Sequence, residues 1–439
     1  MFMSFHSIFT SPLSSKLAFC RLAPVLFVPI AFGGLRLSQT LCTSTNIQRR
    51  YMQPPEAKRV CADNMVPKIG THNGTFHCDE VFACFLLRQL SEYKDAEIVR
   101  TRDPAVLATC DVVVDVGGEF DPKKHRYDHH QRVPTCNHTR MPKCRAALCY
   151  ILLRSFVETF SSLCPEKPWG TRLSSAGLVY LHFGRRVLEE ITQLKPDDRR
   201  LEALYDKLYE NFVEEVDAVD NGISQYDGEA RYAVSSTLSA RVGHLNPRWN
   251  SKSQDTEEGF KQAMKMVGAE FLDRMEFYQN AWLPARAVVE GAVQMRTQVD
   301  PSGEVIVLEQ GGCPWKEHLF FLEKELKVET PIKFVLYPDQ SGQWRVQCVP
   351  AGLHTFQNSL HGEGRILAEA SLSLLEEWRG VRDEALSTLS GIPGCVFVHA
   401  SGFIGGNRTQ QGALEMARRT LQAAAKARGE GKETQANGS

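Results

Sequence analysis

The stretch DVVVDVGG, residues 111–118, is the segment that best defines the fold class. It is an apolar run of the kind expected in a buried parallel strand. Two more strands are expected before it, at 66–70 (VPKIG) and 97–101, and residues 79–90 between them carry apolar side chains at helical spacing. Strands that alternate with helices predict a doubly wound α/β sheet, whose ligands bind beyond the carboxyl ends of the strands.

The C-terminal half predicts a second, smaller α/β unit. Its expected strands are 304–309, 332–338, 344–350 and 394–400, and its expected closing helix is 408–427. Helical character dominates residues 174–221 and about 255–298, and the glycine-containing residues 222–250 are expected to connect the two halves. A chain of 439 residues is too long for one ordinary compact domain, so two domains with tails are expected.

The first 55 residues contain no Asp or Glu but several cations among Ser, Thr, Leu and Phe. This composition predicts a mitochondrial targeting presequence over 1–55 and therefore a location in the mitochondrial matrix; a secretory signal or an unstructured leader are the alternatives. The apolar residues 22–33 are too short and too interrupted by proline to span a bilayer, so no membrane association is expected.

The charge of the chain is balanced, with 51 Lys and Arg against 52 Asp and Glu. A strongly basic coat for nucleic acid is therefore excluded, and any such binding must come from a local patch or from an active site. The 13 cysteines include no CxxC pair, which argues against a disulfide framework.

Metal-ligating side chains gather at or just after the expected strand ends. They are His72, His77 and Asp79 after the first strand, Asp115 at the end of VVVD, Asp128, His129 and His130 in HRYDHHQ, and Asp217 and Asp220 in ENFVEEVDAVDNG. Each has an ordinary explanation when taken alone, since Asp79 can cap a helix and the last two can be solvated helix positions. Asp115 is harder to explain in this way, because a carboxylate that ends an apolar strand is costly to bury unpaired. Together these clusters favour a metal site.

The types of ligand narrow the choice of ion. Carboxylates and imidazoles without thiolate suit Mn²⁺, Mg²⁺, Fe or Zn, and the mixture of nitrogen and oxygen favours Mn²⁺ over Mg²⁺. Two ions bridged by one carboxylate would suit the hydrolysis of a phosphate ester.

Several motifs carry a family resemblance. HNGTFHCDE, VVDVGG, RYDHHQ, LSSAGLVYLHFG and VDAVDNGISQY resemble the DHH phosphoesterase superfamily and, more closely, the melanocyte-proliferating-gene (Myg) family. The resemblance continues through CPWKEH (313–318), WRVQC and FVHASGFIGG (397–406) and covers about 66–425. It implies a DHH-like metal-binding catalytic domain over 66–245 and a substrate-binding α/β domain over 250–428, with the active site in the cleft between them. Residues 429–439 are expected to form a disordered tail.

The resemblance also implies an activity. Myg proteins are associated with 3′→5′ exoribonuclease activity in mitochondria and in the nucleus or nucleolus. The expected substrate is therefore the 3′ end of single-stranded RNA, and the expected cofactor is a pair of Mn²⁺ or Mg²⁺ ions.

Carried over by position, the motifs assign roles to the ligand clusters. Asp115 is expected to bridge the two metals. Asp79, His129 and the acidic helix end are expected to complete one ion, with Asp217 preferred to Asp220. His77 and His72 are expected to complete the other ion. His130 is expected to contact the scissile phosphate, and Asp128 to orient its neighbours, so that Asp128, His129 and His130 form the catalytic group.

The first motif departs from the superfamily pattern. His77 stands where an Asp is usual, and His72 lies one residue farther away than expected. Asn73 is therefore a rival to His72 as a ligand.

Candidate substrate-binding residues lie farther along the chain. The backbone N–H groups of Gly405 and Gly406, with Arg408, are expected to cradle a phosphate at the start of the closing helix, although Asn407 replaces the histidine of related enzymes. A plain strand-to-helix turn is the alternative. Arg241 is a candidate phosphate clamp, and His399 a candidate to line the cleft.

Two observations keep other functions open. Residues 133–154 look like a basic, cysteine-containing insertion directly after the DHH motif, which would allow an inactive RNA-binding protein. The neutral charge allows a phosphoesterase for small substrates such as pyrophosphate, a cyclic dinucleotide or nanoRNA. The oligomeric state is not predicted.

Overall fold

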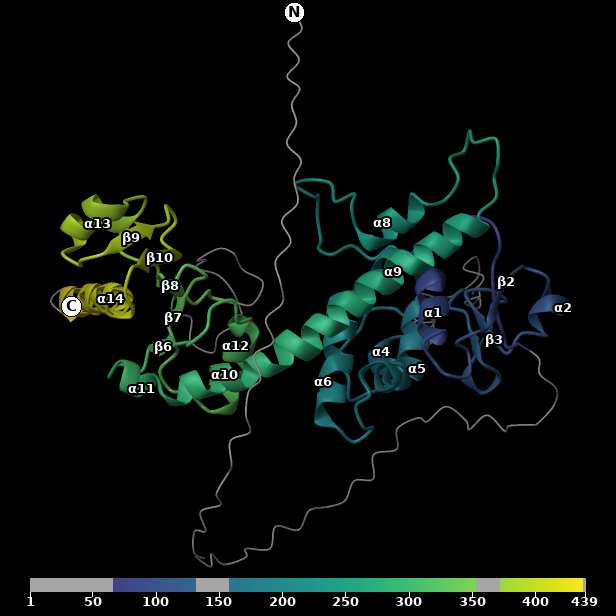
Figure 1. Ribbon diagram of the computed structural model, residues 1–439, viewed down its shortest axis with the longest axis horizontal. Helices are drawn as coiled ribbons and strands as arrows, with labels where there is room; N and C mark the ends of the chain where they lie inside the picture. Colours follow the sequence, from purple (N-terminus) through teal and green to yellow (C-terminus); the bar gives the residue numbers. More distant parts are fainter. Residues whose placement is uncertain (1–65, 132–157, 353–371, 437–439) are drawn as a thin grey trace, which may run out of the picture. The chain divides into compact units, whose positions relative to one another are not determined.

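The computed structural model describes residues 66–131, 158–352 and 372–436 (Figure 1). The predicted presequence (1–55) and the predicted insertion (133–154) lie outside the described residues. None of the helices in the described segments combines the length and the apolar character needed to span a bilayer.

The first sheet has five strands in the order β2-β1-β3-β5-β4. The strands are β1 (Lys68–Thr71), β2 (Glu97–Arg100), β3 (Val112–Val114), β4 (Phe120–Asp121) and β5 (Arg126–Tyr127). Every neighbouring pair is parallel except β4 with β5. Helix α1 (Cys78–Leu87) links β1 to β2, and α2 (Pro104–Leu107) links β2 to β3.

Strand β3 is buried on both faces, as its apolar sequence predicts. Val112 and Val114 belong to the large core that contains α1, whereas Val113 belongs to a small cluster with Leu107 and Cys110 beside α2. Because the chain leaves β1 toward β2 and then crosses back to β3, the sheet reverses its winding between β1 and β3. The predicted doubly wound α/β fold is confirmed, and the switch point marks the expected ligand edge.

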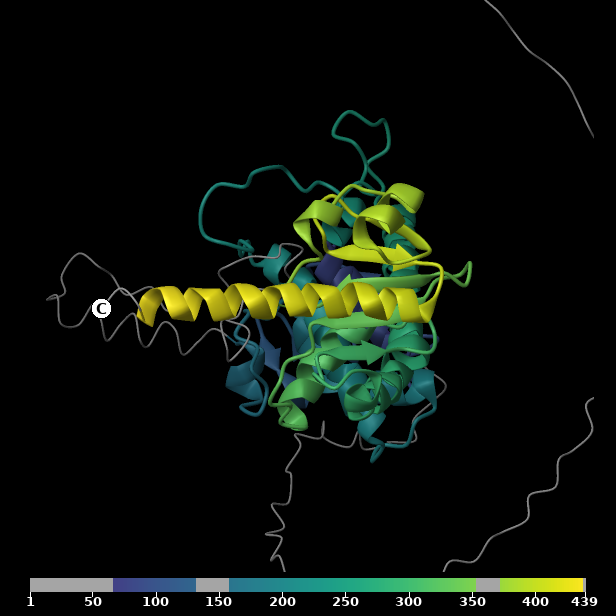
Figure 2. The same ribbon diagram turned by 90° about the vertical axis from the view of Figure 1, so that its left-hand side faces the viewer.

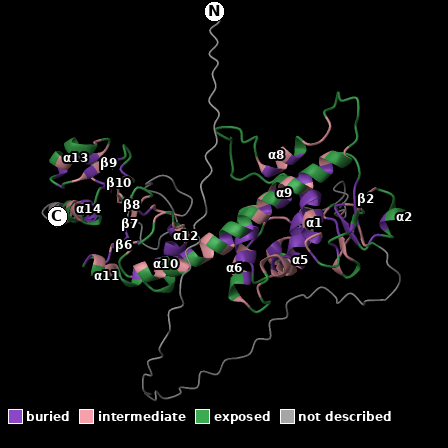
Figure 3. Ribbon diagram, viewed as in Figure 1, coloured by how far each residue is buried: buried purple, intermediate pink, exposed green. Residues whose placement is uncertain are grey.

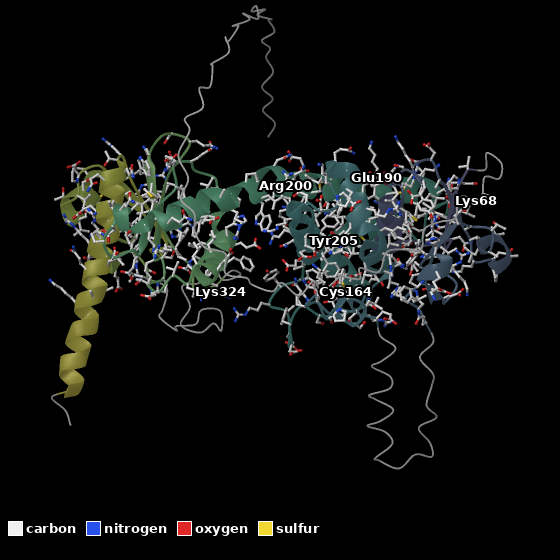
Figure 4. All side chains as sticks on the ribbon, turned by 90° about the horizontal axis from the view of Figure 1, so that it is seen from below. Lys68, Cys164, Glu190, Arg200, Tyr205 and Lys324 are labelled. Atoms are coloured by element: carbon white, nitrogen blue, oxygen red, sulfur yellow. The ribbon has the colours of Figure 1, made fainter. Side chains whose placement is uncertain are left out.

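Helices build the main core of this half. They are α4 (Phe160–Leu163), α5 (Ser175–Thr192), α6 (Arg199–Leu208), η3 (Tyr209–Val213), α7 (Glu214–Asp220) and α9 (Glu257–Phe277). Helix α1 lies among them and is buried along nearly its whole length (Figure 3). Tyr205, labelled in Figure 4, stacks on Tyr180 with 4.8 Å between the ring centroids. Helices α1, α5 and α7, which carry side chains of the candidate site, also pack against one another and are fixed by this core.

The second sheet has its own apolar core and the order β6-β7-β8-β10-β9. Its strands are β6 (Val305–Val307), β7 (Phe334–Pro338), β8 (Trp344–Cys348), β9 (Cys395–Val398) and β10 (Ile404–Asn407). Only β6 and β7 pair in parallel. Helix α14 (Gln410–Ala436) packs across β7, β8 and β10 (Figure 2), and α12 (Trp315–Glu325) and α13 (Asp383–Ser390) complete the unit.

Some predicted boundaries differ from the structure. The connection 222–250 contains a short helix, α8 (Leu238–Gly243). The long helix expected over 255–298 comprises α9, η4 (Tyr278–Trp282), α10 (Leu283–Gln294) and α11 (Arg296–Val299). Helix α14 continues to Ala436, into the segment predicted to be a disordered tail. Strands β4, β5 and β10 were not predicted, because β4 and β5 have only two residues each and β10 contains Gly405 and Gly406, which have no side chain to show a pattern.

Candidate metal site

Three neighbouring parallel strands each deliver a polar residue at their carboxyl end. His72 follows β1, Asp115 follows β3 and Asp128 follows β5. Since β1, β3 and β5 are adjacent in the sheet, these residues lie at one edge of it. All three are buried, so the edge places a dense set of polar groups out of water.

Asp115 occupies the centre of this edge. Its φ of 55° lies in the left-handed region, which a non-glycine residue adopts at a cost of about 1–2 kcal/mol. The N–H of Asp115 donates to the carbonyl oxygen of Tyr127 at 3.1 Å, so the turn is held by β5. The carboxylate then lies 3.3 Å from His72 Nε2, 3.2 Å from His129 Nε2 and 3.3 Å from His130 Nδ1.

Within the described residues, three overlapping groups of side chains place ligand atoms within 4.8 Å of one another. They are His72, His77, Glu80 and Asp115; Asp115, His129 and His130; and His77, Asp79 and Asp220. Asp115 is shared by the first two groups, a position suited to the bridging role that the resemblance implies. The individual ligand roles stay predictions.

Glu80 was missed by the sequence reasoning. Its carboxylate lies 3.0 Å from His72 Nε2 and also accepts the backbone N–H of His77 at 2.8 Å. The available signal was its position three residues after His77, the spacing of a helix capping box, in which an acid is explained by the cap alone. Here the same carboxylate caps α1 and faces the candidate metal group.

His72, rather than its rival Asn73, enters the metal group. His72 is buried, whereas Asn73 is exposed and its side-chain oxygen accepts from Arg102 at 2.9 Å. Arg102, another residue that sequence reasoning missed, also lies 3.3 Å from His72 Nδ1 through its second guanidinium nitrogen. It follows β2 at the same sheet edge and places an exposed cation beside the cluster.

The side of the site formed by helices holds Asp79 and Asp220. Asp79, on α1, accepts a hydrogen bond from the Ser175 hydroxyl at 2.7 Å through one oxygen. Asp220, at the end of α7, lies 3.1 Å from His129 Nε2, and Asp79 lies 3.9 Å from the same nitrogen. His129 is thus surrounded by carboxylates from three elements.

Hydrogen bonds position the two adjacent histidines. The Asp128 carboxylate accepts from the N–H of Gly118 and from the N–H of His130 at 2.9 Å, and it lies 3.0 Å from His130 Nδ1. Arg172 donates to the carbonyl oxygen of His129 at 2.9 Å. The His130 side chain remains 64% exposed, so it is available to a substrate, as the predicted phosphate contact requires.

The residues present fit divalent cations. Asp79 Oδ1, Asp115 Oδ1 and His129 Nε2 are buried side-chain atoms without a hydrogen-bond partner in the described structure, and all three face the same cluster. Buried polar atoms without partners are rare in proteins and need an explanation. Oxygen and imidazole donors that converge in this way are the set that Mn²⁺, Mg²⁺ or Zn²⁺ would accept.

The pKa values of the carboxyl groups in the cluster also support a divalent-cation site. Burial and the Asp79 charge raise the pKa of Asp220 to about 7, and burial raises the pKa of Glu80 to about 8 although His72 opposes it. Burial opposes ionisation of Asp115 too, but the imidazoles of His129, His130 and His72, 3.2–3.3 Å away, hold its pKa well below the usual value. Four carboxylates therefore compete for too few positive partners, and a divalent cation would relieve this competition.

Asp217, the preferred ligand in the sequence analysis, lies outside the cluster. Its Oδ1 accepts from the Ser174 N–H at 2.9 Å, the Ser174 hydroxyl at 2.7 Å and the Gly177 N–H at 3.0 Å. Its Oδ2 accepts from the Tyr209 hydroxyl at 3.0 Å. These four donors occupy the carboxylate inside the core, so the geometry favours Asp220 over Asp217 as the ligand, and the assignment stays a prediction.

The structure also corrects the expected phosphate cradle. Gly405 and Gly406 are residues of β10, paired on one side with β8 and on the other with β9, and do not form a turn before α14. The N–H of Arg408 is bonded to the carbonyl oxygen of Gly394 at 2.8 Å. Asn407 caps the segment that leads into α14 by accepting the N–H of Thr409 at 2.9 Å.

Two other candidates have local partners. Arg241 forms an ion pair with Glu270, with 2.7 Å between Nη2 and Oε2, so a carboxylate already neutralises its guanidinium, and the phosphate-clamp role stays a prediction. His399 is exposed after β9, where its ring contacts Phe403 at 4.8 Å and its Nδ1 lies 2.9 Å from the Ser401 hydroxyl. His399 stays a prediction.

Comparison with known proteins agrees with this chemistry. Residues 68–421 match a family model for MYG1 exonucleases, described as an uncharacterised protein family (UPF0160). A MYG1 exonuclease of Bos taurus is 61% identical over 356 residues, covering 81% of this chain and 84% of the relative. A MYG1 exonuclease of Homo sapiens is 59% identical over 369 residues, covering 84% of this chain and 89% of the relative. A MYG1 protein of Saccharomyces cerevisiae is 40% identical over 374 residues, covering 83% of this chain and 98% of the relative.

Proposed function

Because the chain belongs to the MYG1 exonuclease family, we propose that this nuclease shortens single-stranded RNA from its 3′ end with two divalent ions, preferably Mn²⁺. The observation that carries the metal dependence is the set of buried atoms on Asp79, Asp115 and His129 that make no hydrogen bond in the described structure. The choice of RNA and of the 3′ end rests on the Myg-family resemblance.

Different side chains would hold the ions and contact the substrate. Asp115, between the groups that contain His72 and His129, would hold both ions, while Asp79 and Asp220 would complete one of them. Bound ions of this kind supply an activated water and stabilise the charge of the phosphate in the transition state. The exposed His130 would contact the scissile phosphate, and Asp128 would keep its ring in position.

The test uses the full chain and a 5′-labelled single-stranded RNA, with Mn²⁺ or with EDTA. We expect a ladder that shortens from the 3′ end, is absent in EDTA and is absent in Asp115→Ala. Mn²⁺ should also raise the melting temperature of the wild type, because a ligand of the native state stabilises it by mass action. Hydrolysis of dinucleotides but not of longer strands would favour the small-substrate alternative. Strand binding without turnover would favour the inactive RNA-binding protein.

We further propose that residues 1–55 direct the protein to the mitochondrial matrix, with a second pool in the nucleus or nucleolus. The acid-free composition of this segment supports the first destination. Fusion of residues 1–55 to a fluorescent protein should give mitochondrial fluorescence, and diffuse fluorescence would contradict the proposal.

A further inference from the structure

Residues 230–254, here called the acid-free segment, have an unusual charge distribution. The chain contains 52 acidic residues, yet this stretch of 25 residues contains none. It carries four cations: Arg231, Arg241, Arg248 and Lys252. Arg241 is paired with Glu270, whereas the structure describes no ion pair for the other three within its described residues. A chain without a general basic coat therefore has a local basic stretch.

The same segment holds two isolated aromatic rings in solvent. Trp249 is 92% exposed and Tyr232 is 77% exposed, the highest values among the large hydrophobic side chains that the structure describes. The loops on either side of α8 are almost entirely exposed (Figure 3). Neither ring contributes to a core. Single exposed apolar side chains are common, but rings that lie beside cations are the combination with which proteins bind single-stranded nucleic acid.

The acid-free segment is attached to the candidate metal site. Helix α8, which lies within it, packs against α1 and α7, the helices that carry Asp79 and Asp220. Asn246 accepts the N–H of Phe76 at 3.0 Å and donates to its carbonyl oxygen at 2.8 Å, directly before His77. These two hydrogen bonds connect the acid-free segment to the loop between β1 and α1. They are made by Asn246, three residues before Trp249.

A second set of hydrogen bonds holds the chain just beyond the acid-free segment. The Arg100 guanidinium donates to the Thr256 hydroxyl at 2.8 Å and to the carbonyl oxygen of Gly74 at 2.7 Å. The Arg100 side chain is 2% exposed, so these hydrogen bonds are shielded from water. The loop that contains His72 and His77 is thus bonded to residues before and after Trp249.

We propose that the acid-free segment binds the single-stranded substrate outside the metal site, with Trp249 and Tyr232 stacking on bases and Arg248, Lys252 and Arg231 facing phosphates. This inference rests on the proposed function and assigns part of its substrate recognition. Aromatic stacking needs unpaired bases, so the segment selects a single strand over a duplex. Stacking does not read the 2′-hydroxyl, so the segment contributes equally to RNA and to single-stranded DNA.

The composition favours nucleic acid over a protein partner. Protein interfaces place aromatic side chains in an apolar centre and are depleted of lysine. Here a cation directly precedes each ring: Arg231 precedes Tyr232, and Arg248 precedes Trp249. Trp249 is followed by Asn250, Ser251 and Lys252, whereas Tyr232 is followed by Ala233 and Val234. A ring beside a cation offers a base a stacking surface and its phosphate a positive partner.

The test measures binding of a labelled 20-nucleotide single strand by the full chain in EDTA, so that no hydrolysis occurs. We expect Trp249→Ala and Tyr232→Ala each to raise the Kd by roughly 5- to 100-fold. Trp249→Phe, which keeps a ring, should recover most of the affinity. Phe321→Ala on α12 removes a ring that is 52% exposed outside the segment, and it should bind like the wild type. The double variant Arg248→Gln, Lys252→Gln should reduce the salt dependence, with the slope of log K against log salt shallower by about 1.4.

The outcomes separate this inference from the proposed function. Equal affinity in all variants, or equal loss in Phe321→Ala, would overturn the inference. A wild type that hydrolyses dinucleotides but binds no strand would also overturn it and leave the phosphodiester chemistry standing. A wild type that binds strands through Trp249 but hydrolyses nothing with Mn²⁺ would support it and refute the nuclease function. A dimer in sedimentation that Trp249→Ala dissociates, with the strand Kd unchanged, would assign the surface to a second copy of the chain instead.

Discussion

Asp217 and Asp220 lie one helical turn apart on α7, and their carboxylates have different surroundings. Asp217 is fully buried and accepts four hydrogen bonds from Ser174, Gly177 and Tyr209. Asp220 is partly exposed and lies 3.1 Å from His129 Nε2. One helix end thus supplies an anchor for the core and a candidate metal ligand, and the two positions form a natural pair for experiments.

The first prediction compares Asp220→Asn with Asp217→Asn. Removing the charge of Asp220 should lower Mn²⁺ affinity and hydrolysis on the order of 100-fold, because the cluster loses an anionic ligand. Asp217→Asn should retain the metal affinity of the wild type, since its carboxylate does not face the site. Isothermal titration with Mn²⁺ and the RNA assay measure both effects. The reverse pattern would restore Asp217 as the ligand.

The second prediction concerns the pH dependence of stability. Burial raises the pKa of Asp217 to about 7, although its four hydrogen-bond donors oppose the rise. A carboxyl with a raised folded pKa is most favourable below its unfolded pKa of about 3.9, and its contribution is lost as the pH rises toward about 7. In Asp217→Asn the amide oxygen keeps the three donors, and the Tyr209 hydroxyl can turn to accept from the amide nitrogen.

Urea unfolding at pH 5.5 and pH 8 tests this expectation. Relative to Asp217→Asn, the unfolding free energy of the wild type should be about 2 kcal/mol lower at pH 8 than at pH 5.5. The loss accumulates over the roughly 1.5 pH units between pH 5.5 and the folded pKa, at about 1.4 kcal/mol per unit. Using the difference between the variants cancels the other groups that titrate in this range. A constant difference would mean that the four donors keep Asp217 ionised throughout.

The third prediction tests Glu80, which the sequence reasoning missed. Glu80→Gln keeps a side-chain oxygen that can accept the His77 N–H, so the cap of α1 should survive. It removes the charge 3.0 Å from His72, and Mn²⁺ affinity should fall by roughly 10- to 100-fold. Glu97→Gln, an exposed carboxylate on β2, is the matched control and should bind like the wild type. Unchanged affinity in Glu80→Gln would limit this residue to its capping role.

The sequence predicted the parts of the fold that depend on periodicity. The apolar run of β3, the helical spacing of α1 and the order of strands predict the first sheet and the edge that bears His72 and Asp115. The choice between Asp217 and Asp220 on α7 could not be made from spacing, because spacing does not say which of two acids on one helix meets Ser174 and Tyr209, which lie elsewhere in the chain. Gly405 and Gly406 resemble a phosphate turn in sequence, yet pairing with β8 and β9 makes them part of a strand.

The last prediction concerns Gly177 on α5, whose missing side chain makes room for Asp217. A Cβ at Gly177 would overlap both carboxylate oxygens of Asp217, and α5 and α7 are both held by the core. Gly177→Ala should therefore destabilise the protein by about 1–3 kcal/mol or more, despite the higher helix propensity of alanine. Gly291→Ala on α10 is the control, because no atom beyond the neighbouring residues and the local backbone of its own helix lies within 4 Å of its added Cβ, and it should stabilise by about 0.5–1 kcal/mol.

Chemical unfolding of both variants measures the two free energies. In the double variant Gly177→Ala, Asp217→Ala the overlap is removed, so the additional cost of Gly177→Ala should be much smaller than in the wild type. If Gly177→Ala is as harmless as Gly291→Ala, α5 and α7 are not held as close together as this contact requires, and the separation of Asp217 from the metal site would lose its structural basis.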